Sequence, residues 1–284
     1  MLVKSTKIPS HKIHFAFTHG SKLTIREAFG FYSLRKLSYG NNKRKRSNMV
    51  TDAQLKNFRG QGYFIIEDMF TAHEIDDLTA HIEPFVHAHE ANLAKAGNDG
   101  ISRAKEISFT THLAEKDSAI KAFVSQPKLV NIATTILGPN VRLYWDQAVY
   151  KRPETRRDFP WHQDTGYTPV IPEEYLTCWV ALENANIENG CIWIMPGTQT
   201  QGLVEHKETP VGKQCYFGSD PGIAVELRKG SVAFFSSLTF HRSGPNLSGT
   251  IRKGYIIQYA EADVRDKVSG EPRGQFLVAE AGLC

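Results

Sequence analysis

The chain has 284 residues, of which 41% are hydrophobic and 23% charged, and a chain of this size and balance can bury a core without disulfides or structural metals. No apolar run approaches the roughly 18 residues that a membrane-spanning helix needs. The formal net charge of +4 is an uneven average, because residues 1–48 carry a net +10 and leave −6 for the rest of the chain. The basic character therefore belongs to one segment, not to the whole protein.

Residues 1–48 form a basic N-terminal extension that ends in Lys43-Arg44-Lys45-Arg46. Three interpretations fit it: an upstream extension without a folded role before a second start at Met49, an acid-poor targeting peptide, or a nucleic-acid or nuclear-import patch. We place it outside the core and expect a single domain over residues 49–284. Its helical part would span about 52–138 and its β core about 141–262.

The first half of this domain has helical patterns. Thr51 is a candidate N-cap for a short helix with Leu55 and Phe58 facing inward, and Gly60-Gln61-Gly62 breaks it. A short β-rich run follows at 63–66. Thr71 caps a second helix, whose apolar residues are spaced by three and four. Residues 117–137 are predicted to be helical, with an interruption at Pro127.

From residue 141 the pattern becomes that of short strands. Runs rich in β-branched and aromatic residues are separated by turn residues, at 141–150, 175–183, 191–195, 223–227, 231–235 and 251–261. Helices followed by many strands predict a mainly β fold with flanking helices (α+β), in which a sandwich or barrel is buttressed by helices on one face.

The cysteines contain no C-x-x-C pair and are few for a secreted scaffold; they are Cys178, Cys191, Cys215 and Cys284. They are interpreted as reduced thiols of an intracellular protein. We expect a cytoplasmic location, with organelle targeting through residues 1–48 as the alternative.

The most informative stretch is Phe159–Tyr167, which contains His162-x-Asp164. On an extended strand, residues two apart project to the same face. An imidazole and a carboxylate together are two thirds of a 2-His-1-carboxylate site, which leaves positions open on a non-heme Fe(II). With eleven histidines in the chain, this pair alone is weak evidence and needs support elsewhere.

Support comes from a second stretch that begins at Phe240-His241. His241 follows His162 by several predicted strands, which a closed double sheet can return to its side. Arg252 follows eleven residues later on the last long strand and can bind a carboxylate through two charge-assisted hydrogen bonds. Ser243 shares a strand face with His241 and can donate to the same carboxylate.

Together with the segment Glu188–Gly197, these residues resemble the phytanoyl-CoA dioxygenase family over about residues 52–265. This family comprises Fe(II)/2-oxoglutarate-dependent oxygenases with a double-stranded β-helix (jelly-roll, cupin-like) core. The resemblance implies that His162, Asp164 and His241 are the catalytic iron ligands. It also implies cosubstrate-binding roles for a further set: Arg252, Ser243, Trp179, Gln147 and Lys105.

The implied reaction is the oxidation, most simply the hydroxylation, of a C–H bond of a small organic or lipid-like molecule. It consumes O2 and 2-oxoglutarate and releases succinate and CO2, with ascorbate as a possible activator. The carboxylate of Asp164 argues against halogenation, because halogenating relatives have a small residue there. One departure is visible, since the family usually continues Pro-Gly with Ser-His and this chain has Thr198-Gln199.

Two other functions compete with this one. A cupin-like metal protein that is not an oxygenase, such as an isomerase or small-ligand binder, would use the same ligands without Arg252. A nucleic-acid-associated protein would act through residues 1–48, although one basic tetrapeptide without a recognition fold is slight support. The loops Gly166–Glu174 and Thr198–Gly222 are expected to face the substrate.

Overall fold

The computed structural model describes residues 50–153 and 155–281. The predictions made for residues 1–48, and that for Cys284, lie outside these residues. The three described cysteines are free thiols. Within the described ranges, no helix has the length and apolar character required to cross a membrane.

The described residues contain four α-helices, all of them before the long strand that begins at Val141. Helix α1 (Asp52–Gln61) begins at the Thr51 capping box, and Gly62 ends it with a φ of 82°, a left-handed conformation that suits glycine. Helix α2 (Ala72–Ala96) begins with a second capping box at Thr71. The predicted helical region at 117–137 forms two helices, α3 (Ser118–Val124) and α4 (Pro127–Leu137). Pro127 divides them because proline suits the first turn of a helix but not its interior.

The strands form one large and one small antiparallel sheet, accompanied by two short strand pairs, β10–β11 and β7–β16. The large sheet has the order β1-β13-β8-β15-β5-β4-β3-β2, with β17 paired to β5, and the small sheet has the order β12-β9-β14-β6. In chain order the bounds are β1 (Tyr63–Ile66), β2 (Asn98–Asp99), β3 (Ser102–Arg103), β4 (Ile107–Thr111), β5 (Val141–Lys151), β6 (Phe159–His162), β7 (Val170–Ile171), β8 (Leu176–Ala181), β9 (Ile192–Ile194), β10 (Lys207–Thr209), β11 (Gly212–Gln214), β12 (Ile223–Val225), β13 (Val232–Ser236), β14 (His241–Ser243), β15 (Arg252–Glu261), β16 (Arg265–Asp266) and β17 (Leu277–Ala279).

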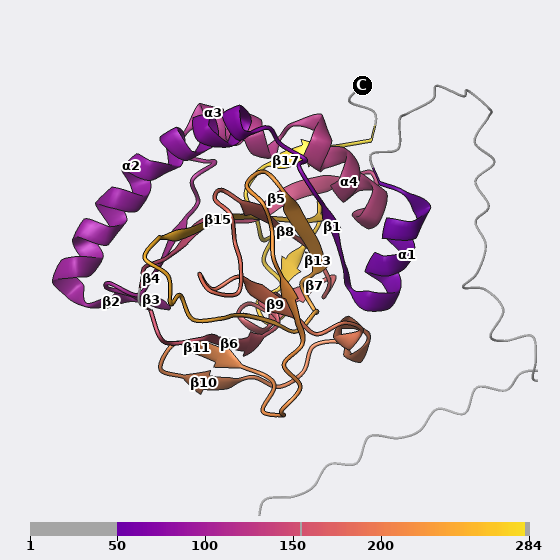
Figure 1. The fold of residues 1–284 in the computed structure, drawn as a ribbon. Helices are drawn as coiled ribbons and strands as arrows, with labels where there is room; N and C mark the ends of the chain where they lie inside the picture. The colour runs from indigo at the N-terminus through magenta and orange to yellow at the C-terminus, as the bar shows by residue number, and fades with distance from the viewer. Residues whose placement is uncertain (1–49, 154, 282–284) are drawn as a thin grey trace, which may run out of the picture. The chain divides into compact units, whose positions relative to one another are not determined.

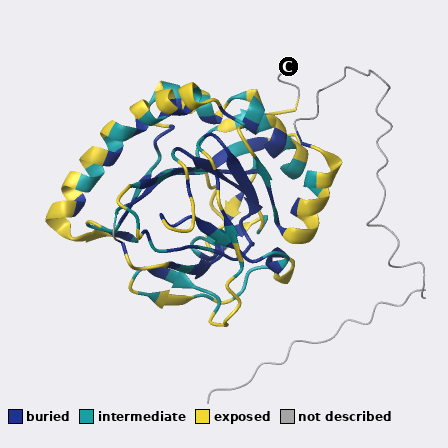
Figure 2. Ribbon diagram, viewed as in Figure 1, coloured by how far each residue is buried: buried dark blue, intermediate teal, exposed yellow. Residues whose placement is uncertain are grey.

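The two faces of the large sheet serve different cores. On β8, Cys178 and Val180 belong to the core that the sheet shares with the helices, whereas Trp179 and Ala181 belong to the core that it shares with the small sheet. This alternation is the period of two expected of a strand that is buried on both sides. Figure 1 shows the helices arranged around the outside of the strands, and Figure 2 shows the buried residues concentrated between them. The predicted mainly β fold with helices on one face is confirmed.

Several strands were not predicted from the sequence, and one predicted conformation was wrong. The strand β4 (Ile107–Thr111) mixes serine and threonine with its apolar residues, which weakens its pattern. Asp164 does not continue strand β6, because it begins the short 3-10 helix η1 (Asp164–Gly166). Gln163 between them is extended, with φ −106° and ψ 140°, so the side chains of His162 and Asp164 still project to the same side.

Candidate metal centre

Strand pairing brings the two distant histidines together. Strands β6 and β14 are antiparallel neighbours in the small sheet, and His162 and His241 are partners in their register. Their ring centroids are 4.1 Å apart. Residues facing each other across such a pair are within side-chain reach, so the sheet alone accounts for the meeting of two residues far apart in sequence.

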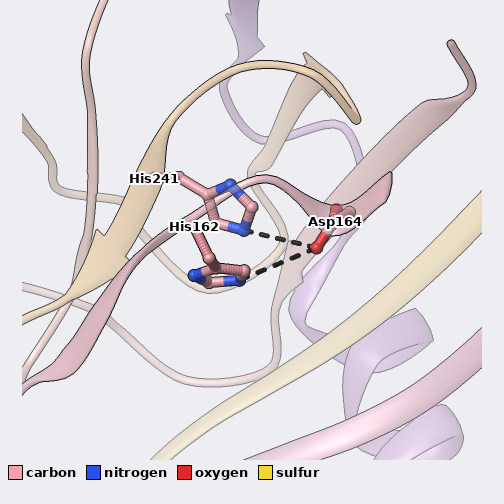
Figure 3. A group of neighbouring side chains, drawn as sticks. All are labelled: His162, Asp164 and His241. Atoms are coloured by element: carbon pink, nitrogen blue, oxygen red, sulfur yellow. Dashed lines mark ion pairs between the residues drawn. The ribbon is translucent and has the colours of Figure 1, made fainter. Parts of the chain in front are cut away.

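Asp164 completes a three-residue cluster. Its Oδ1 lies 3.8 Å from Nε2 of His162 and 3.4 Å from Nε2 of His241. One ligand atom from each of the three residues lies within 4.8 Å of the others, and Figure 3 shows both imidazole rings directed at the carboxylate. This is the spacing that three ligands of a single metal ion require, and the predicted triad is therefore assembled.

Local hydrogen bonds fix which imidazole nitrogen can bind a metal. Nδ1 of His162 lies 2.8 Å from the Pro160 carbonyl oxygen, and Nδ1 of His241 lies 3.0 Å from the Thr239 carbonyl oxygen. A carbonyl can only accept, so each Nδ1 carries the hydrogen and each Nε2 presents its lone pair. Both rings are thus held by backbone two residues upstream, as metal-binding histidines commonly are.

The second oxygen of Asp164 is also engaged. Its Oδ2 accepts a 2.6 Å hydrogen bond from the hydroxyl of Thr177 on β8. Gln258 on β15 donates in turn to the Thr177 oxygen, at 3.4 Å. The large sheet therefore orients the carboxylate of a residue that belongs to the small-sheet side.

Burial shifts the pKa values of His162 and Asp164. Removal from water, together with the nearby His241, lowers the pKa of His162 to about 3. For Asp164, burial alone would raise the pKa, but the neighbouring His241, His162 and the Thr177 hydroxyl together lower it below its ordinary value. The centre thus offers two imidazoles and one carboxylate, a donor set that suits Fe(II) and leaves it redox-competent.

The cluster lies in a cavity of about 190 Å³ between the two sheets. Its wall includes four of the five predicted cosubstrate residues: Gln147, Trp179, Ser243 and Arg252. Most of the remaining lining is apolar or aromatic, including Ile107, Phe109, Val149, Phe159 and Ile256. An apolar cavity with a few convergent polar groups is the usual form of a small-molecule site.

Arg252 is a buried cation without an anionic partner in the described part of the chain. Its side chain is 1% exposed, and Nη1 donates to the Val149 carbonyl oxygen at 3.3 Å. The guanidinium lies 5.5 Å from the Trp179 ring centroid, and its Nε meets no acceptor among the described residues. Burial lowers its pKa to about 10. Because a buried charge without a partner is costly, this donor set fits an anion that enters the cavity, such as the distal carboxylate of 2-oxoglutarate.

Comparison with known proteins agrees with this geometry. The family model for phytanoyl-CoA dioxygenase (PhyH) matches residues 58–254. The chain belongs to the phytanoyl-CoA dioxygenase family. The predicted class, an iron- and 2-oxoglutarate-dependent dioxygenase, is thereby confirmed at the level of the family.

Individual relatives within this family are distant. The peroxisomal phytanoyl-CoA dioxygenase of Mus musculus is 24% identical over 76% of this chain and 70% of its own length. A probable alpha-ketoglutarate-dependent hypophosphite dioxygenase of Stutzerimonas stutzeri is 26% identical, over 74% of this chain and 78% of its own.

Solved structures agree on the fold. The carbocyclase SnoK from nogalamycin biosynthesis, a non-heme alpha ketoglutarate-dependent enzyme, has a TM-score of 0.65 at 21% identity, over 80% of this chain and 95% of its own. The non-heme monooxygenase ThoJ has the same TM-score at 20% identity, over 79% of this chain and 83% of its own. The cupin-like oxygenase core expected from the resemblance is thus confirmed.

One residue expected from the family resemblance is not brought to the site. Lys105 is exposed in the turn before β4, with φ 64°, and does not line the cavity. The residues of the cavity wall closest to it in sequence, Ile101 and Ile107, are apolar. A weak match by sequence position alone could not distinguish a strand residue from the turn beside it.

The departure from the family pattern at Thr198-Gln199 has a structural role. The Thr198 hydroxyl donates to the Met195 carbonyl oxygen and accepts from the Phe240 backbone N–H. Gln199 donates to the Arg59 carbonyl oxygen at 3.1 Å. These contacts tie β9, β14 and helix α1 together, and neither residue lines the cavity.

Two residues that support the site, Thr177 and Lys151, were not predicted from the sequence. Thr177 orients Asp164, and Lys151, at the end of β5, contacts the Ser243 hydroxyl at 3.1 Å. Neither belongs to a motif with recognisable spacing. Threonine is common in strands, and Lys151 closes a run that predicts only a strand, so no signal in the sequence distinguishes them.

Proposed function

We propose that the protein hydroxylates a C–H bond of a small, largely apolar molecule, with 2-oxoglutarate as cosubstrate and His162, Asp164 and His241 as iron ligands. The observation that carries the proposal is the buried Arg252 guanidinium, which has no anionic partner among the described residues and lies in the same cavity as the triad. Iron held by the triad would activate dioxygen at the expense of 2-oxoglutarate, which leaves as succinate and CO2.

The residues around the proposed iron site have separate roles in binding the metal and the cosubstrate. The imidazole Nε2 atoms and the Asp164 carboxylate would hold the metal, while the backbone carbonyls and Thr177 fix the orientation of these side chains. Arg252 pairs with the distal carboxylate of 2-oxoglutarate, with Ser243 as a second donor. Trp179 forms the wall beneath the guanidinium. Fixing both ends of the cosubstrate limits its orientations, and this restriction increases the rate of the reaction.

The rest of the cavity favours a substrate without strong charge. Arg242 also lines the cavity, but its Nη1 already pairs with Asp158 at 2.7 Å, and its guanidinium lies over the rings of Trp161 and Trp193. With Arg252 assigned to the cosubstrate, no unpaired cation in the described lining remains for a small anion. Relatives named for hypophosphite and methylphosphonate therefore differ from this chain in the substrate that we propose.

The side chains of Gln147 and Trp145 add one polar feature to this wall. The indole N–H of Trp145 donates to Oε1 of Gln147 at 3.2 Å. This leaves the Gln147 amide nitrogen as a donor toward a cosubstrate or substrate oxygen, in keeping with the role that the family resemblance gives it.

The test is a substrate panel scored by succinate. The full chain is incubated with Fe(II), 2-oxoglutarate, ascorbate and O2, and neutral apolar compounds are compared with small phosphorus oxyanions. We expect substrate-dependent succinate with a neutral apolar member, and none from the Asp164→Ala variant. Iron and 2-oxoglutarate binding without any succinate would instead support the non-oxygenase metal protein. Stimulation by the oxyanions alone would contradict the proposed substrate class.

A further inference from the structure

Lys151 is a buried lysine surrounded by oxygen atoms next to the proposed cosubstrate site. It ends strand β5 and is the register partner of Arg252 on β15, and its side chain is 1% exposed. Its Nζ lies 2.5 Å from the Gly244 carbonyl oxygen, 3.1 Å from the Ser243 hydroxyl, 3.3 Å from the Arg157 carbonyl oxygen and 3.5 Å from the Ser243 carbonyl oxygen. No carboxylate pairs with it within residues 50–153 and 155–281. An unpaired lysine at such depth is rare and needs a reason.

The chemistry of these partners constrains the Ser243 hydroxyl. The two nearest carbonyl oxygens, those of Gly244 and Arg157, can only accept, so they take two of the hydrogens on Nζ. A protonated lysine has a third hydrogen and no lone pair, so it donates to the Ser243 hydroxyl oxygen, which at 3.1 Å is nearer than the Ser243 carbonyl oxygen at 3.5 Å. The serine's own hydrogen is then free to donate elsewhere. A neutral lysine would instead accept that hydrogen on its lone pair, and Ser243 could no longer serve an anion.

Ser243 is placed where the direction of its hydrogen bond with Lys151 affects ligand binding. It lines the cavity together with Arg252 and Trp179, whereas Lys151 does not reach the cavity wall. Lys151 therefore acts from behind the serine and not on a ligand directly.

We propose that Lys151 is a positioning residue that fixes the Ser243 hydroxyl as a hydrogen-bond donor to the distal carboxylate of 2-oxoglutarate. The proposal rests on the proposed function, because it assumes that this carboxylate occupies the Arg252 end of the cavity. It assigns Lys151 a role in the affinity for the cosubstrate and none in holding iron.

Electrostatics adds a dependence on pH. Burial lowers the pKa of Lys151 to about 7, and Arg252 is the next cause. Of the other charged groups that face it, Arg242 also lowers the pKa, while Asp158 and Glu106 raise it. A carboxylate bound beside Arg252 favours the charged lysine and raises its pKa. Binding is therefore expected to take up protons near neutral pH, and the affinity for 2-oxoglutarate falls as the pH rises above 7.

The first test compares two ligands on the anaerobic, Fe(II)-loaded protein. Binding of 2-oxoglutarate is measured beside that of 2-oxobutanoate, which has the same 2-oxo acid group but no distal carboxylate. For Lys151→Met and for Ser243→Ala we expect about tenfold weaker binding of 2-oxoglutarate, the loss of roughly one charge-assisted hydrogen bond. The double variant should lose no more than either single one. Binding of 2-oxobutanoate should not change.

Lys253→Met is the matched control. Lys253 follows Arg252 in β15, but its Nζ pairs with Glu83 at 2.8 Å and the residue does not line the cavity. It should bind both ligands as the unmodified protein does. If Lys151→Met weakened the binding of both ligands equally, the role of Lys151 would be merely structural and the proposal would be overturned. Unchanged binding of 2-oxoglutarate would overturn it as well.

The second test needs no variant, so it stands even if Lys151→Met fails to fold. Calorimetric titration of the Fe(II)-loaded protein with 2-oxoglutarate at pH 7.5, in buffers of different ionisation enthalpy, reports the protons taken up. We expect a fractional uptake with 2-oxoglutarate and none with 2-oxobutanoate, and equal values for the two ligands overturn the proposal. If the protein binds neither ligand, the proposed function itself fails.

Discussion

The two ends of the cavity differ in how far the protein satisfies its own polar groups. At the metal end, both imidazole Nδ1 atoms and Oδ2 of Asp164 have hydrogen-bond partners supplied by the fold. At the opposite end, Arg252 retains an unpartnered Nε, and the described residues bring no carboxylate to it. The metal end is thus oriented before anything binds, whereas the arginine end has a charge that only a ligand can neutralise. Changes at the two ends should therefore separate metal affinity from cosubstrate affinity.

The largest effect is expected from Asp164→Ala. Loss of the only anionic ligand should weaken Fe(II) binding by more than about 100-fold, since even the loss of an outer partner of a ligand typically costs 10–100-fold. Equilibrium dialysis of iron under anaerobic conditions measures this. Asp76→Ala is the matched control, because Asp76 pairs with Lys229 on the surface. Iron affinity equal to that of the control would remove Asp164 from the centre.

Arg252→Met should produce the complementary result. The affinity for 2-oxoglutarate is expected to fall by about 100-fold, the loss of a buried charge-assisted pair, while Fe(II) affinity stays the same. The ligand-free variant should also unfold at a higher temperature, because it no longer buries an unpaired charge.

Arg152→Met is the contrast for this arginine. Arg152 follows β5 directly and pairs with Glu90, so its replacement should lower the unfolding temperature and leave cosubstrate binding unchanged. If Arg252→Met lowered the unfolding temperature of the ligand-free protein as much as Arg152→Met does, the claim that Arg252 is a buried unpaired charge would be contradicted.

A smaller effect is expected from Thr177→Val, which keeps the shape of the side chain but removes its hydroxyl. Oδ2 of Asp164 loses its 2.6 Å hydrogen bond, and Fe(II) affinity should fall by about tenfold. Binding of 2-oxobutanoate to the iron-loaded variant should stay normal. Thr177→Ser retains the hydroxyl and should restore most of the iron affinity; failure to do so would assign the loss to packing.

The smallest change in affinity is expected from Gly254→Ala, at the arginine end. A Cβ at this position would lie 2.5 Å from a carbon of the Trp179 ring, the ring over which the Arg252 guanidinium lies. We expect a loss of about 1–3 kcal/mol in the free energy of unfolding from overpacking and a few-fold weaker binding of 2-oxoglutarate. Chemical denaturation and ligand titration measure the two effects. A change in Fe(II) affinity in place of cosubstrate affinity would contradict this assignment.

The main residues of both ends were visible in the sequence. His162, Asp164, His241 and Arg252 could be named because their residue types and spacing resemble a family pattern. The local conformation of Asp164 was not foreseen, since a 3-10 turn and a strand can present the same side chain. The resemblance suggested Lys105 by position alone, and the structure places it outside the cavity.

The supporting residues could not be found from sequence because tertiary register creates their roles. Thr177 meets Asp164 across the space between two sheets, and Lys151 at the end of β5 in the large sheet meets Ser243 on β14 in the small sheet. In the sequence alone, each is an ordinary residue in the middle or at the end of a predicted strand. The helices and most long strands were predictable, since caps, proline and β-branched runs act locally.

The central claim is that one cavity holds a metal at one end and a carboxylate at the other. Its most direct test is an anaerobic titration of the Fe(II)-loaded protein with 2-oxoglutarate, followed by the weak visible charge-transfer band that a 2-oxo acid gives on iron. The unmodified chain should develop the band at low cosubstrate concentration. Arg252→Met should develop the same band only at about 100-fold higher concentration, and Asp164→Ala should give none at equal iron. An unmodified chain without the band, or equal titrations for all three proteins, would contradict the account.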